Sequence, residues 1–321
     1  MKIAVLALEG VFDTGLTAAL DAFSLANKFS ARMMGGTPRF DVSLVGVRRK
    51  VRTGLGLALP VLPIASALKP DWALIPALNT GSPEVLVPAL ARPDVKSAIE
   101  QAIAWRAQGT LIAASCIGTF LLAEAGLLDG REATTTWWLS PLFRQRYPNV
   151  MLDESRMLVP TDVGVTAGAA MGHLDLALWL IRKASPELAS VVSRYLLADL
   201  RSSQAPYIIP NHLAQADPLI QRFERWSRDR LKNGFSLQAA SAALATSPRS
   251  LQRKCQEVLG KSPLAYFQDL RVERAQSLLH GSGLDIEAIA AEVGYEDGAT
   301  LRTLLRQRLG RGVRELRADL R

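Results

Sequence analysis

The stretch SLQAASAALATSPRSLQRKCQEVLG, residues 236–260, has a near-repeat about 50 residues further on, DIEAIAAEVGYEDGATLRTLLRQRLG, residues 285–310. When the two are aligned backwards from their closing glycines, the apolar positions of the last helix coincide at an offset of 50. The aligned pairs are Leu251 with Leu301, Cys255 with Leu305, and Leu259 with Leu309. Each copy predicts a helix, a tight turn and a second helix, the arrangement in which the second helix enters the DNA major groove.

The starts and turns of the two copies also correspond. Ser236 and Asp285 stand where a side-chain oxygen can accept hydrogen bonds from the free amides of a helix start. Ala245 in the first turn corresponds to Gly294 in the second, whose turn is one residue longer. We therefore expect the same local structure twice.

The second helix of each copy carries residue types that recognise DNA. Apolar residues at spacings of three and four predict the inward side, which is Leu251, Cys255 and Val258 in the first copy and Leu301, Leu304 and Leu305 in the second. The residues left outward are Arg249, Ser250, Gln252, Arg253 and Gln256 in the first copy, and Ala299, Thr300, Arg302, Thr303 and Arg306 in the second. Arginine can bind guanine edges and glutamine adenine edges, each through two hydrogen bonds, and the remaining contacts go to phosphates. The alternative is that both faces are ordinary solvated helix surfaces.

A helix over residues 263–280 separates the copies, with Pro263 in its first turn and Gly281 just past its end. Eighteen residues at about 1.5 Å each give a rod of roughly 27 Å, close to the ~34 Å repeat of DNA once the flanking turns are added. The rod is predicted to place both recognition helices in successive major grooves.

Composition supports a two-domain protein that contacts an anionic partner. The 321 residues are enough for two or three domains. Residues 231–321 hold 14 Lys and Arg against 10 Asp and Glu, whereas residues 1–230 hold 24 against 20, so the net charge of +8 is more than twice as dense in the carboxyl-terminal part. That distribution suits phosphate contact.

The sequence also indicates where the protein acts. It has no apolar run of 18 residues, and MKIAVLALEG reads as a buried strand rather than a signal peptide. We expect a cytoplasmic protein without a membrane partner. Its two cysteines, Cys116 and Cys255, fall in different predicted domains, so we expect no structural disulfide. We expect no metal and no cofactor.

The first two hundred residues alternate short apolar strands with amphipathic helices, which predicts a mostly parallel sheet covered on both faces. Ligands of such folds bind beyond the carboxyl ends of the strands. Cys116 follows the apolar strand LIAAS and precedes a small-residue turn into a helix, an arrangement that resembles a nucleophile elbow. The helix dipole there is expected to favour thiolate, and the alternative is a small buried cysteine without chemistry.

A cysteine hydrolase also needs a base, and the chain has three histidines, His173, His212 and His280. His212 and His280 lie in or near the helical carboxyl-terminal part, which leaves His173. Because His173 stands at the entry to the helix LDLALWLI, a helix-start or packing role is the favoured interpretation.

Residues 215–317 resemble the AraC/XylS family of transcription regulators, whose DNA-binding domain has seven helices and two helix-turn-helix units. The strings SPRSLQRKCQEVLGKSPLAYFQDLRVERAQSLL and IEAIAAEVGYEDGATLRTLLRQRLG carry this resemblance. The positions that match the family after the first unit and in the linker helix are Gly260, Ser262, Pro263, Tyr266, Arg271, Arg274 and Ala275. In the second unit, Leu301 and Leu305 replace the family's usual aromatics and GRGVRELR replaces its usual ending, so base reading is expected mainly from the first unit.

Residues 1–205 resemble the amidotransferase-like (ThiJ/PfpI) domain, and the whole chain is similar to AraC regulators of the GlxA type. The stretches ASCIGTFLLAEAGLLDGREATTTWW, TAGAAMGHLDLALWLI and RSSQAPY carry this resemblance. It places Cys116 at the elbow, Thr136 where many relatives have a histidine before Trp137, and Asp13 at the acidic position after the first strand. PALNTG, residues 76–81, replaces a glycine pair that offers backbone donors to an oxyanion. Loss of the base and of these donors implies a sensor rather than an enzyme.

These observations predict a flavodoxin-like α/β domain over residues 1–205, a linker over 206–216, and an all-α DNA-binding domain over 217–321. The expected function is that of a sequence-specific transcription regulator, an activator that works as a homodimer with promoter DNA and RNA polymerase. Its effector is expected to be a small, nitrogen-containing metabolite bound near Asp13, Cys116, Thr136 and Trp137. Two alternatives stay open: a Cys116-dependent hydrolase, amidase or deglycase with an attached DNA-binding domain, and a non-specific basic DNA-binding protein.

Overall fold

The computed structural model describes residues 1–33, 39–66, 69–199 and 201–318. The chain divides into two compact units. The first comprises Met1–Leu139 and Tyr147–Gln204, and the second comprises Ser140–Arg146 and Ala205–Arg321. The residues predicted as a linker contain a short helix, α8 (Pro210–Ala214), in which Pro210 occupies the first turn and Leu213 and Ala214 are buried.

The first unit is built on a seven-stranded sheet in the order β10-β11-β7-β6-β1-β2-β5. Its strands are β1 (Lys2–Leu6), β2 (Asp41–Gly46), β5 (Leu62–Pro63), β6 (Trp72–Ile75), β7 (Leu111–Ser115), β10 (Leu158–Pro160) and β11 (Gly164–Ala167). Every pair of neighbours is parallel except β10 with β11. Short pairs form beside it, β3 (Lys50–Arg52) with β4 (Ala58–Pro60) and β8 (Glu132–Ala133) with β9 (Met151–Leu152). The predicted mostly parallel sheet is confirmed.

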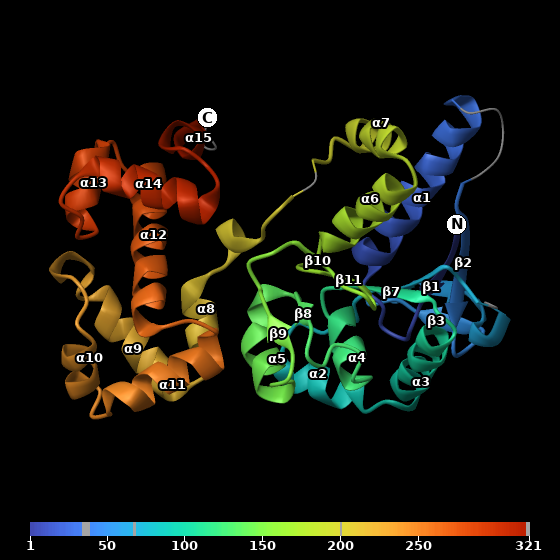
Figure 1. Cartoon of the computed structure of the whole chain (residues 1–321), viewed down its shortest axis with the longest axis horizontal. Coiled ribbons are helices and arrows are strands. Elements are labelled where there is room, and N and C mark those ends of the chain that lie inside the picture. The colour runs from blue at the N-terminus through green and yellow to red at the C-terminus, as the bar shows by residue number, and fades with distance from the viewer. Residues whose placement is uncertain (34–38, 67–68, 200, 319–321) are drawn as a thin grey trace. The chain divides into compact units, whose positions relative to one another are not determined.

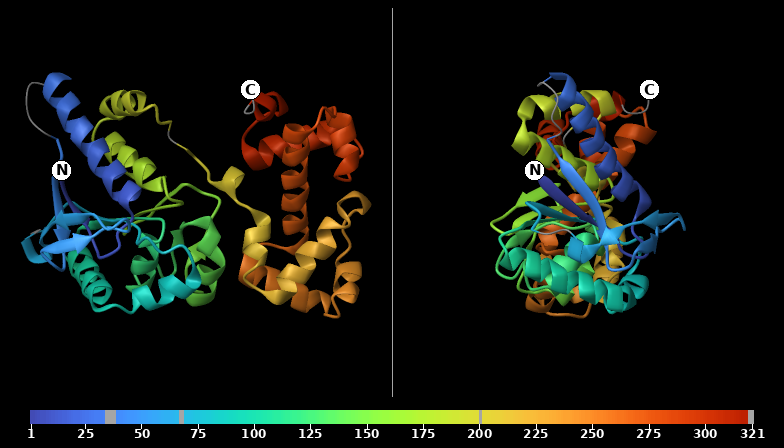
Figure 2. Two further views of the ribbon diagram at one scale, coloured as in Figure 1. Left: turned by 180° about the vertical axis from the view of Figure 1, so that it is seen from behind. Right: turned by 90° about the vertical axis from the view of Figure 1, so that its right-hand side faces the viewer.

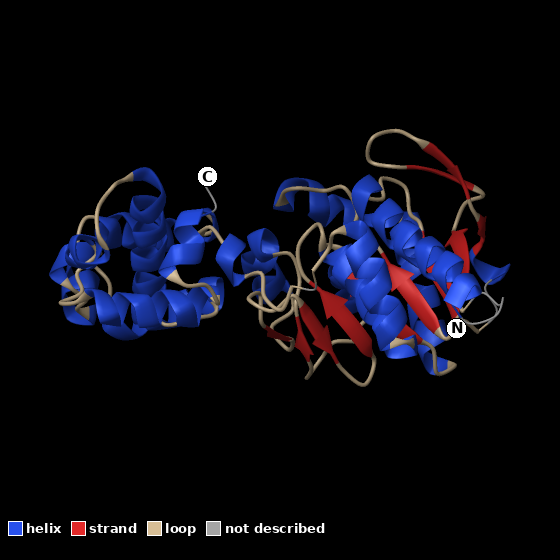
Figure 3. Ribbon diagram, turned by 90° about the horizontal axis from the view of Figure 1, so that it is seen from above, coloured by secondary structure: helices blue, strands red, loops and turns tan. Residues whose placement is uncertain are grey.

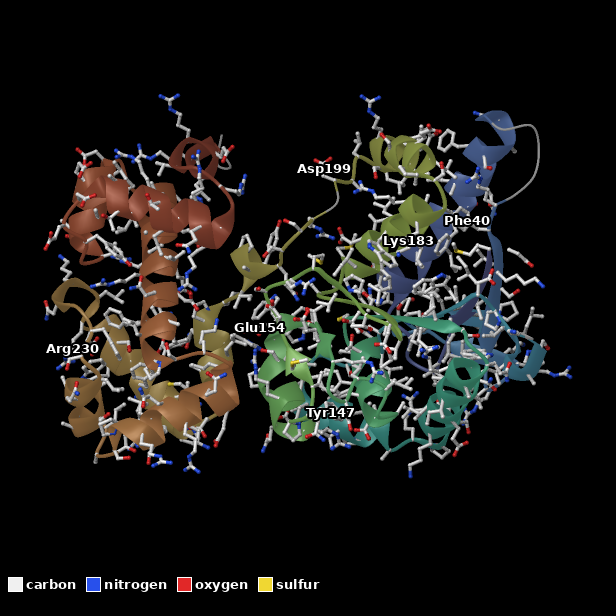
Figure 4. All side chains as sticks on the ribbon, in the orientation of Figure 1. Phe40, Tyr147, Glu154, Lys183, Asp199 and Arg230 are labelled. Carbon is white, nitrogen blue, oxygen red and sulfur yellow. The ribbon has the colours of Figure 1, made fainter. Side chains whose placement is uncertain are left out.

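Helices cover both faces of this sheet, as predicted (Figures 1 and 2). One face carries α1 (Asp13–Met33), α6 (Gly172–Ala184) and α7 (Pro186–Leu196), and the other carries α2 (Pro83–Leu90), α3 (Pro93–Ala107) and α4 (Gly118–Glu124). The core under α1 and α6 includes Phe40, labelled in Figure 4, whose ring lies 5.4 Å from that of Phe23. β6 is buried along its whole length, and β1 and β7 are buried from their second residue on, so the buried residues are apolar or small without alternation.

The strand order locates the place where a ligand can bind. Among the central strands the order β2-β1-β6-β7-β11 is the doubly wound 2-1-3-4-5 arrangement, in which the connections diverge between the first and third strands. That switch point lies between β1 and β6. The segments that leave their carboxyl ends carry Asp13 and the PALNTG loop, and Cys116 follows the next strand, β7.

In the long part of the second unit, the regular elements of the described residues 205–318 are all helices joined by loops, as Figure 3 shows. After α8 come α9 (Pro218–Arg228), α10 (Leu237–Ala243), α11 (Pro248–Leu259), α12 (Pro263–Gly281), α13 (Ile286–Glu292), α14 (Gly298–Leu309) and α15 (Val313–Ala318). The earlier segment of this unit contains α5 (Ser140–Arg146). The predicted rod over residues 263–280 is α12. None of the helices in the residues described above combines the length and the apolar character that crossing a membrane requires.

Candidate functional site

The two predicted helix-turn-helix units form as the sequence indicates. Ser236 Oγ accepts the Ala239 N–H at 3.2 Å and caps α10, and Asp285 Oδ1 accepts the Ala288 N–H at 2.8 Å and caps α13. The second helices of both units have caps too: Ser247 Oγ accepts the Ser250 N–H at 3.1 Å at the start of α11, and Asp297 Oδ1 accepts the Thr300 N–H at 2.6 Å at the start of α14. Both N-caps expected from the sequence are confirmed.

The burial of α11 and α14 repeats residue by residue. From Leu251 to Leu259 and from Leu301 to Leu309 the order of buried, half-buried and exposed positions is the same. The fully buried residues are the three aligned pairs, Leu251 with Leu301, Cys255 with Leu305, and Leu259 with Leu309. Val258 and Leu304 are half-buried rather than fully inward, because each lies at the border of its apolar stripe.

Every residue predicted to contact DNA lies on the outer side of its helix. Nine of the ten are exposed. Ser250 is half-buried, and its backbone N–H and hydroxyl both bond to the cap Ser247. On α11, Arg249, Gln252 and Gln256 make no side-chain hydrogen bond or ion pair to another residue within the described parts of the chain. Arg253 Nε lies 3.8 Å from Glu257 Oε1 across one exposed helix turn, a weak ion pair.

The outer face of α14 is different, because three of its four predicted polar side chains already have partners. Thr300 Oγ1 donates to Asp297 Oδ2 at 3.0 Å, and Thr303 Oγ1 donates to the Ala299 carbonyl at 3.0 Å. Arg302 Nη2 lies 3.6 Å from Glu287 Oε1. Arg306 is the cation of this predicted set that has no ion pair to any described residue.

The start of α14 also carries negative charge. Hydrogen bonds from the Thr300 N–H and hydroxyl hold the pKa of Asp297 below its ordinary value, so this carboxylate is ionised at neutral pH. A phosphate that approached the same helix end would be repelled. The two outer faces therefore differ in their chemistry although the two backbones match.

The second unit is tied together through α12. The Arg271 guanidinium is buried and donates to the Leu231 carbonyl at 2.7 and 3.1 Å. It also lies 4.9 Å from the Phe267 ring centre and 4.8 Å from that of Tyr295. Two buried hydrogen bonds and two cation–π contacts on one planar group fix its place.

Asp269 of α12 forms a second bridge, which joins α12 to the carboxyl-terminal ends of α11 and α14. Its Oδ2 accepts from Lys261, just after α11, at 3.0 Å, and its Oδ1 accepts from Arg308 in α14 at 2.9 Å. The resemblance pointed to Arg271, but sequence reasoning missed Asp269. The pairing of one acid with cations 8 residues before it and 39 after it leaves no local signal.

In the first unit, the carboxyl edge of the sheet gathers buried polar atoms without partners. Within the described residues these are Asp13 Oδ1, Thr80 Oγ1, Ser115 Oγ, Thr119 Oγ1 and Thr136 Oγ1. Asp13 and Thr136 were predicted, whereas the other three were missed because an isolated hydroxyl residue in a loop or helix start has no distinctive pattern. Buried polar atoms of this kind favour a polar ligand or water, since an unmet hydrogen bond costs about 1–3 kcal/mol.

Asp13 begins α1 and has one oxygen engaged. Its Oδ2 accepts the Leu55 N–H at 2.9 Å, and its Oδ1 is buried with no donor among the described residues. The carboxylate thus offers one open acceptor to a ligand that carries an N–H or O–H group. Trp137 lies in a short 3₁₀ turn, half-buried, with its ring 5.6 Å from that of Trp138.

Cys116 has the backbone of an elbow and the protonation state of a buried thiol. Its φ is 55°, a left-handed conformation that is rare for a residue with a side chain. Burial raises the pKa of Cys116 to about 12, against smaller lowering contributions from the Ile117 N–H and the nearby Thr136 hydroxyl. The expectation that the helix dipole favours thiolate is therefore wrong, because desolvation outweighs it.

His173 is buried and packed within the first unit. Its Nδ1 donates to the Ala170 carbonyl at 2.6 Å, and its Nε2 accepts the Ala77 N–H at 3.0 Å, so both ring nitrogens are occupied. Burial lowers the pKa of His173 to about 4 and keeps the ring neutral. The packing role expected from the sequence agrees with these bonds.

Three backbone N–H groups of the PALNTG loop are hydrogen-bonded within the first unit. Ala77 N–H goes to His173, the Asn79 N–H donates to Gly10 O at 2.7 Å, and the Thr80 N–H donates to Leu78 O at 2.9 Å. An oxyanion would need a pair of free donors pointing at one place. The N–H groups of Ala77, Asn79 and Thr80 are therefore not free donors for an oxyanion.

The chain is similar in sequence to several known proteins. Residues 240–319 match the family described as a helix-turn-helix domain. The HTH-type transcriptional regulator GbdR of Pseudomonas aeruginosa is 27% identical over 192 residues, which cover 59% of this chain and 52% of GbdR. The HTH-type transcriptional regulator GlxA of Rhizobium meliloti is 28% identical over 191 residues, 57% of each chain. The chain thus spans about half the length of these curated relatives.

A solved structure shares the fold. The crystal structure of a candidate transcriptional regulator protein from Vibrio parahaemolyticus superimposes with a TM-score of 0.50 at 18% identity, over 61% of this chain and 98% of that one.

Proposed function

We propose that the chain is an AraC-family transcription regulator with an amidotransferase-like amino-terminal domain, and that it binds promoter DNA in response to a small metabolite. The first recognition helix, α11, supplies the sequence-specific contacts in this proposal. The single observation that carries it is the repeated burial of α11 and α14, which leaves an arginine- and glutamine-bearing face outward on α11.

The effector belongs at the carboxyl edge of the sheet, beside Asp13, Cys116, Thr136 and Trp137. The unpartnered oxygen of Asp13 favours a ligand with a hydrogen-bond donor, and a positively charged nitrogen meets its charge as well. This supports the small nitrogen-containing metabolite expected from the family resemblance. Homodimer formation, activation of transcription and contact with RNA polymerase complete the proposal and rest on that resemblance.

We infer that the amino-terminal domain binds its ligand without turning it over. The observation that supports this inference is the engagement of both His173 nitrogens together with the protonated, buried Cys116. A hydrolase remains the second candidate because the left-handed backbone of Cys116 is the kind of strain found at nucleophile elbows.

The test of the DNA-binding proposal uses the full chain and a library of random duplexes. After selection at physiological salt, the enriched sequence and an unrelated duplex of equal length are titrated side by side. We expect binding to the selected site to be tighter by about 10³-fold or more. Equal affinity for both duplexes, with a steep loss on added salt, would instead identify a non-specific basic protein.

A further inference from the structure

Residues 201–204 lie bonded along the first unit immediately before the second unit begins at Ala205. The Met157 N–H donates to Ser202 O at 3.3 Å, and the Gln204 N–H donates to Ser155 O at 2.8 Å. Ser203 Oγ donates to the same Ser155 carbonyl at 2.7 Å. This short segment is therefore docked like an added strand, and we call residues 201–204 the docking segment.

Gln204 sends its side chain from this segment into the domain. The residue is completely buried, and its Nε2 donates to Thr135 O at 2.9 Å, Thr134 Oγ1 at 3.1 Å and Arg156 O at 3.2 Å. Gly168 makes room for it, because a Cβ on Gly168 would overlap the Gln204 amide. The RSSQAPY motif, residues 201–207, thus contains one residue that reaches the interior.

Thr135, which bonds Gln204, also bonds Cys116 at the candidate ligand edge. Thr135, whose carbonyl accepts from Gln204, donates through its own Oγ1 to the Cys116 carbonyl at 2.9 Å. The next residue, Thr136, places its unpartnered hydroxyl near the Cys116 thiol. Cys116, Thr135 and Gln204 are therefore connected in series by two hydrogen bonds, from the elbow to the docking segment.

The docking of Gln204 combines favourable and unfavourable contributions. Its amide nitrogen is well bonded, but its Oε1 is buried without a partner among the described residues. An unmet buried acceptor opposes the hydrogen bonds made by the same side chain, so a small change at Thr135 can shift the balance between docked and released. A ligand acts on such an element only if it binds the two states with different affinity.

We propose that Gln204 couples occupancy of the edge beside Thr136 to the docking of residues 201–204. A ligand that bonds Thr136 or displaces the Cys116 turn moves the Thr135 carbonyl and changes how firmly Gln204 is held. Because residues 205–321 of the second unit follow directly in the chain, the segment that precedes them is then held or released. This inference rests on the proposed function in taking that edge as the effector site.

Coupling of this kind is reciprocal, so it can be measured from either end without the effector. The forward experiment uses the full chain and iodoacetamide at fixed pH, and follows alkylation of Cys116 by peptide mass spectrometry. Cys255, buried in the second unit, reports unfolding of that unit, and urea unfolding of each variant under the same conditions reports unfolding of the first unit. Two variants disturb the side chain of Gln204. Gln204→Ala removes it, and Gly168→Ala displaces it by steric overlap while residue 204 stays glutamine. The control Ser203→Ala removes a hydrogen bond of the docking segment that does not involve Gln204, Thr135 or Cys116.

In Gln204→Ala and Gly168→Ala we expect Cys116 to be alkylated about tenfold faster, while the alkylation rate of Cys255 stays unchanged. Loss of one buried hydrogen bond makes local opening around Cys116 more frequent by about this factor. Ser203→Ala should speed amide exchange at residues 203–204 and leave the Cys116 rate within about twofold of wild type. An unchanged Cys116 rate in both relay variants overturns the proposal, and so does an equal rise in Ser203→Ala.

The reverse experiment decides the matter if the variants unfold globally. Wild-type protein alkylated at Cys116 should show faster amide exchange in the docking segment than unmodified protein, and unaltered exchange there overturns the coupling. Neither arm involves DNA. A chain that shows the coupling and binds no specific DNA would disprove the proposed function alone, and the opposite result would disprove the coupling alone.

Discussion

Ala245 and Gly294 occupy the same place in the two helix-turn-helix copies, and both have left-handed backbones, with φ of 52° and 82°. Their surroundings differ. A Cβ on Gly294 would overlap the Leu231 carbonyl and the Arg271 guanidinium, whereas Ala245 is exposed and carries its Cβ without obstruction. The second copy needs glycine because it packs against the Arg271 bridge, and the first copy does not.

Gly294→Ala should therefore destabilise the second unit by roughly 2 kcal/mol or more, through left-handed strain and displacement of Arg271. The matched variant Ala245→Gly should stay within about 1 kcal/mol of the parent, since relief of strain and added chain entropy oppose each other. Urea unfolding followed by fluorescence measures both. Equal effects of the two variants would contradict this account.

Arg253→Ala should weaken binding to the selected DNA site by roughly 1–3 kcal/mol if Arg253 reads a base. Arg306→Ala, on the more internally bonded face of α14, should weaken the selected site and a random duplex alike and reduce the salt slope by about 1. Titrations of both duplexes at several salt concentrations separate the two results. A uniform loss for Arg253→Ala would make it a phosphate contact too.

Cys116 should react slowly with thiol reagents at neutral pH, because its pKa of about 12 leaves almost no thiolate. The raised pKa also affects stability. Above pH 9 the unfolded chain loses this proton while the folded chain keeps it, so the free energy of unfolding should fall by about 1.4 kcal/mol per pH unit from this group. Cys116→Ser should remove that dependence. Rapid thiol modification at pH 7, with turnover of a substrate lost in Cys116→Ser, would revive the hydrolase.

His173 should make the first unit sensitive to acid. Its pKa is about 4 in the folded state, below the ordinary value of 6.5, so the unfolded state binds the proton first as the pH falls. Stability should decline between pH 6.5 and 4, by roughly 3 kcal/mol in all from this residue. Comparing wild type with His173→Gln by urea unfolding at pH 7.5 and pH 5 isolates the contribution. Parallel losses in both proteins would show that other groups dominate.

Asp13→Asn should abolish the thermal stabilisation that a cationic effector gives, because it removes the charge and leaves an amide of the same shape. A ligand at 100 times its dissociation constant raises wild-type stability by about 2.7 kcal/mol. A thermal-shift screen of amino acids and quaternary amines against both proteins is the measurement. A hit that stabilises both equally would place its charged group away from Asp13.

The sequence was sufficient to predict the repeated helices. The inward residues of α11 and α14 follow from a spacing of three and four alone, and Leu251 and Leu301 are buried as that spacing requires. Caps at Ser236 and Asp285 are equally local. Such features depend on neighbours within one helix turn, which a single sequence displays.

Features that depend on distant packing could not be predicted in the same way. The protonation of Cys116 is set by burial under segments far along the chain, whereas its local position at a helix start suggested the opposite. The prolines between 206 and 216 predicted a linker, yet Pro210 starts α8, and its carbonyl accepts the Tyr266 hydroxyl at 3.0 Å. Proline interrupts a helix from within but is well suited to begin one.

The Asp269 and Arg271 bridges have a consequence for the operator itself. Because Asp269 in α12 bonds Lys261 just after α11 and Arg308 in α14, contacts to α12 set the separation and orientation of these two helices within the second unit. One base pair inserted between the DNA segments that the two helices contact rotates one segment away by about a tenth of a helical turn. Two helices held at a set separation cannot follow that rotation. Any promoter that uses both copies must keep that spacing unchanged, whatever bases lie between.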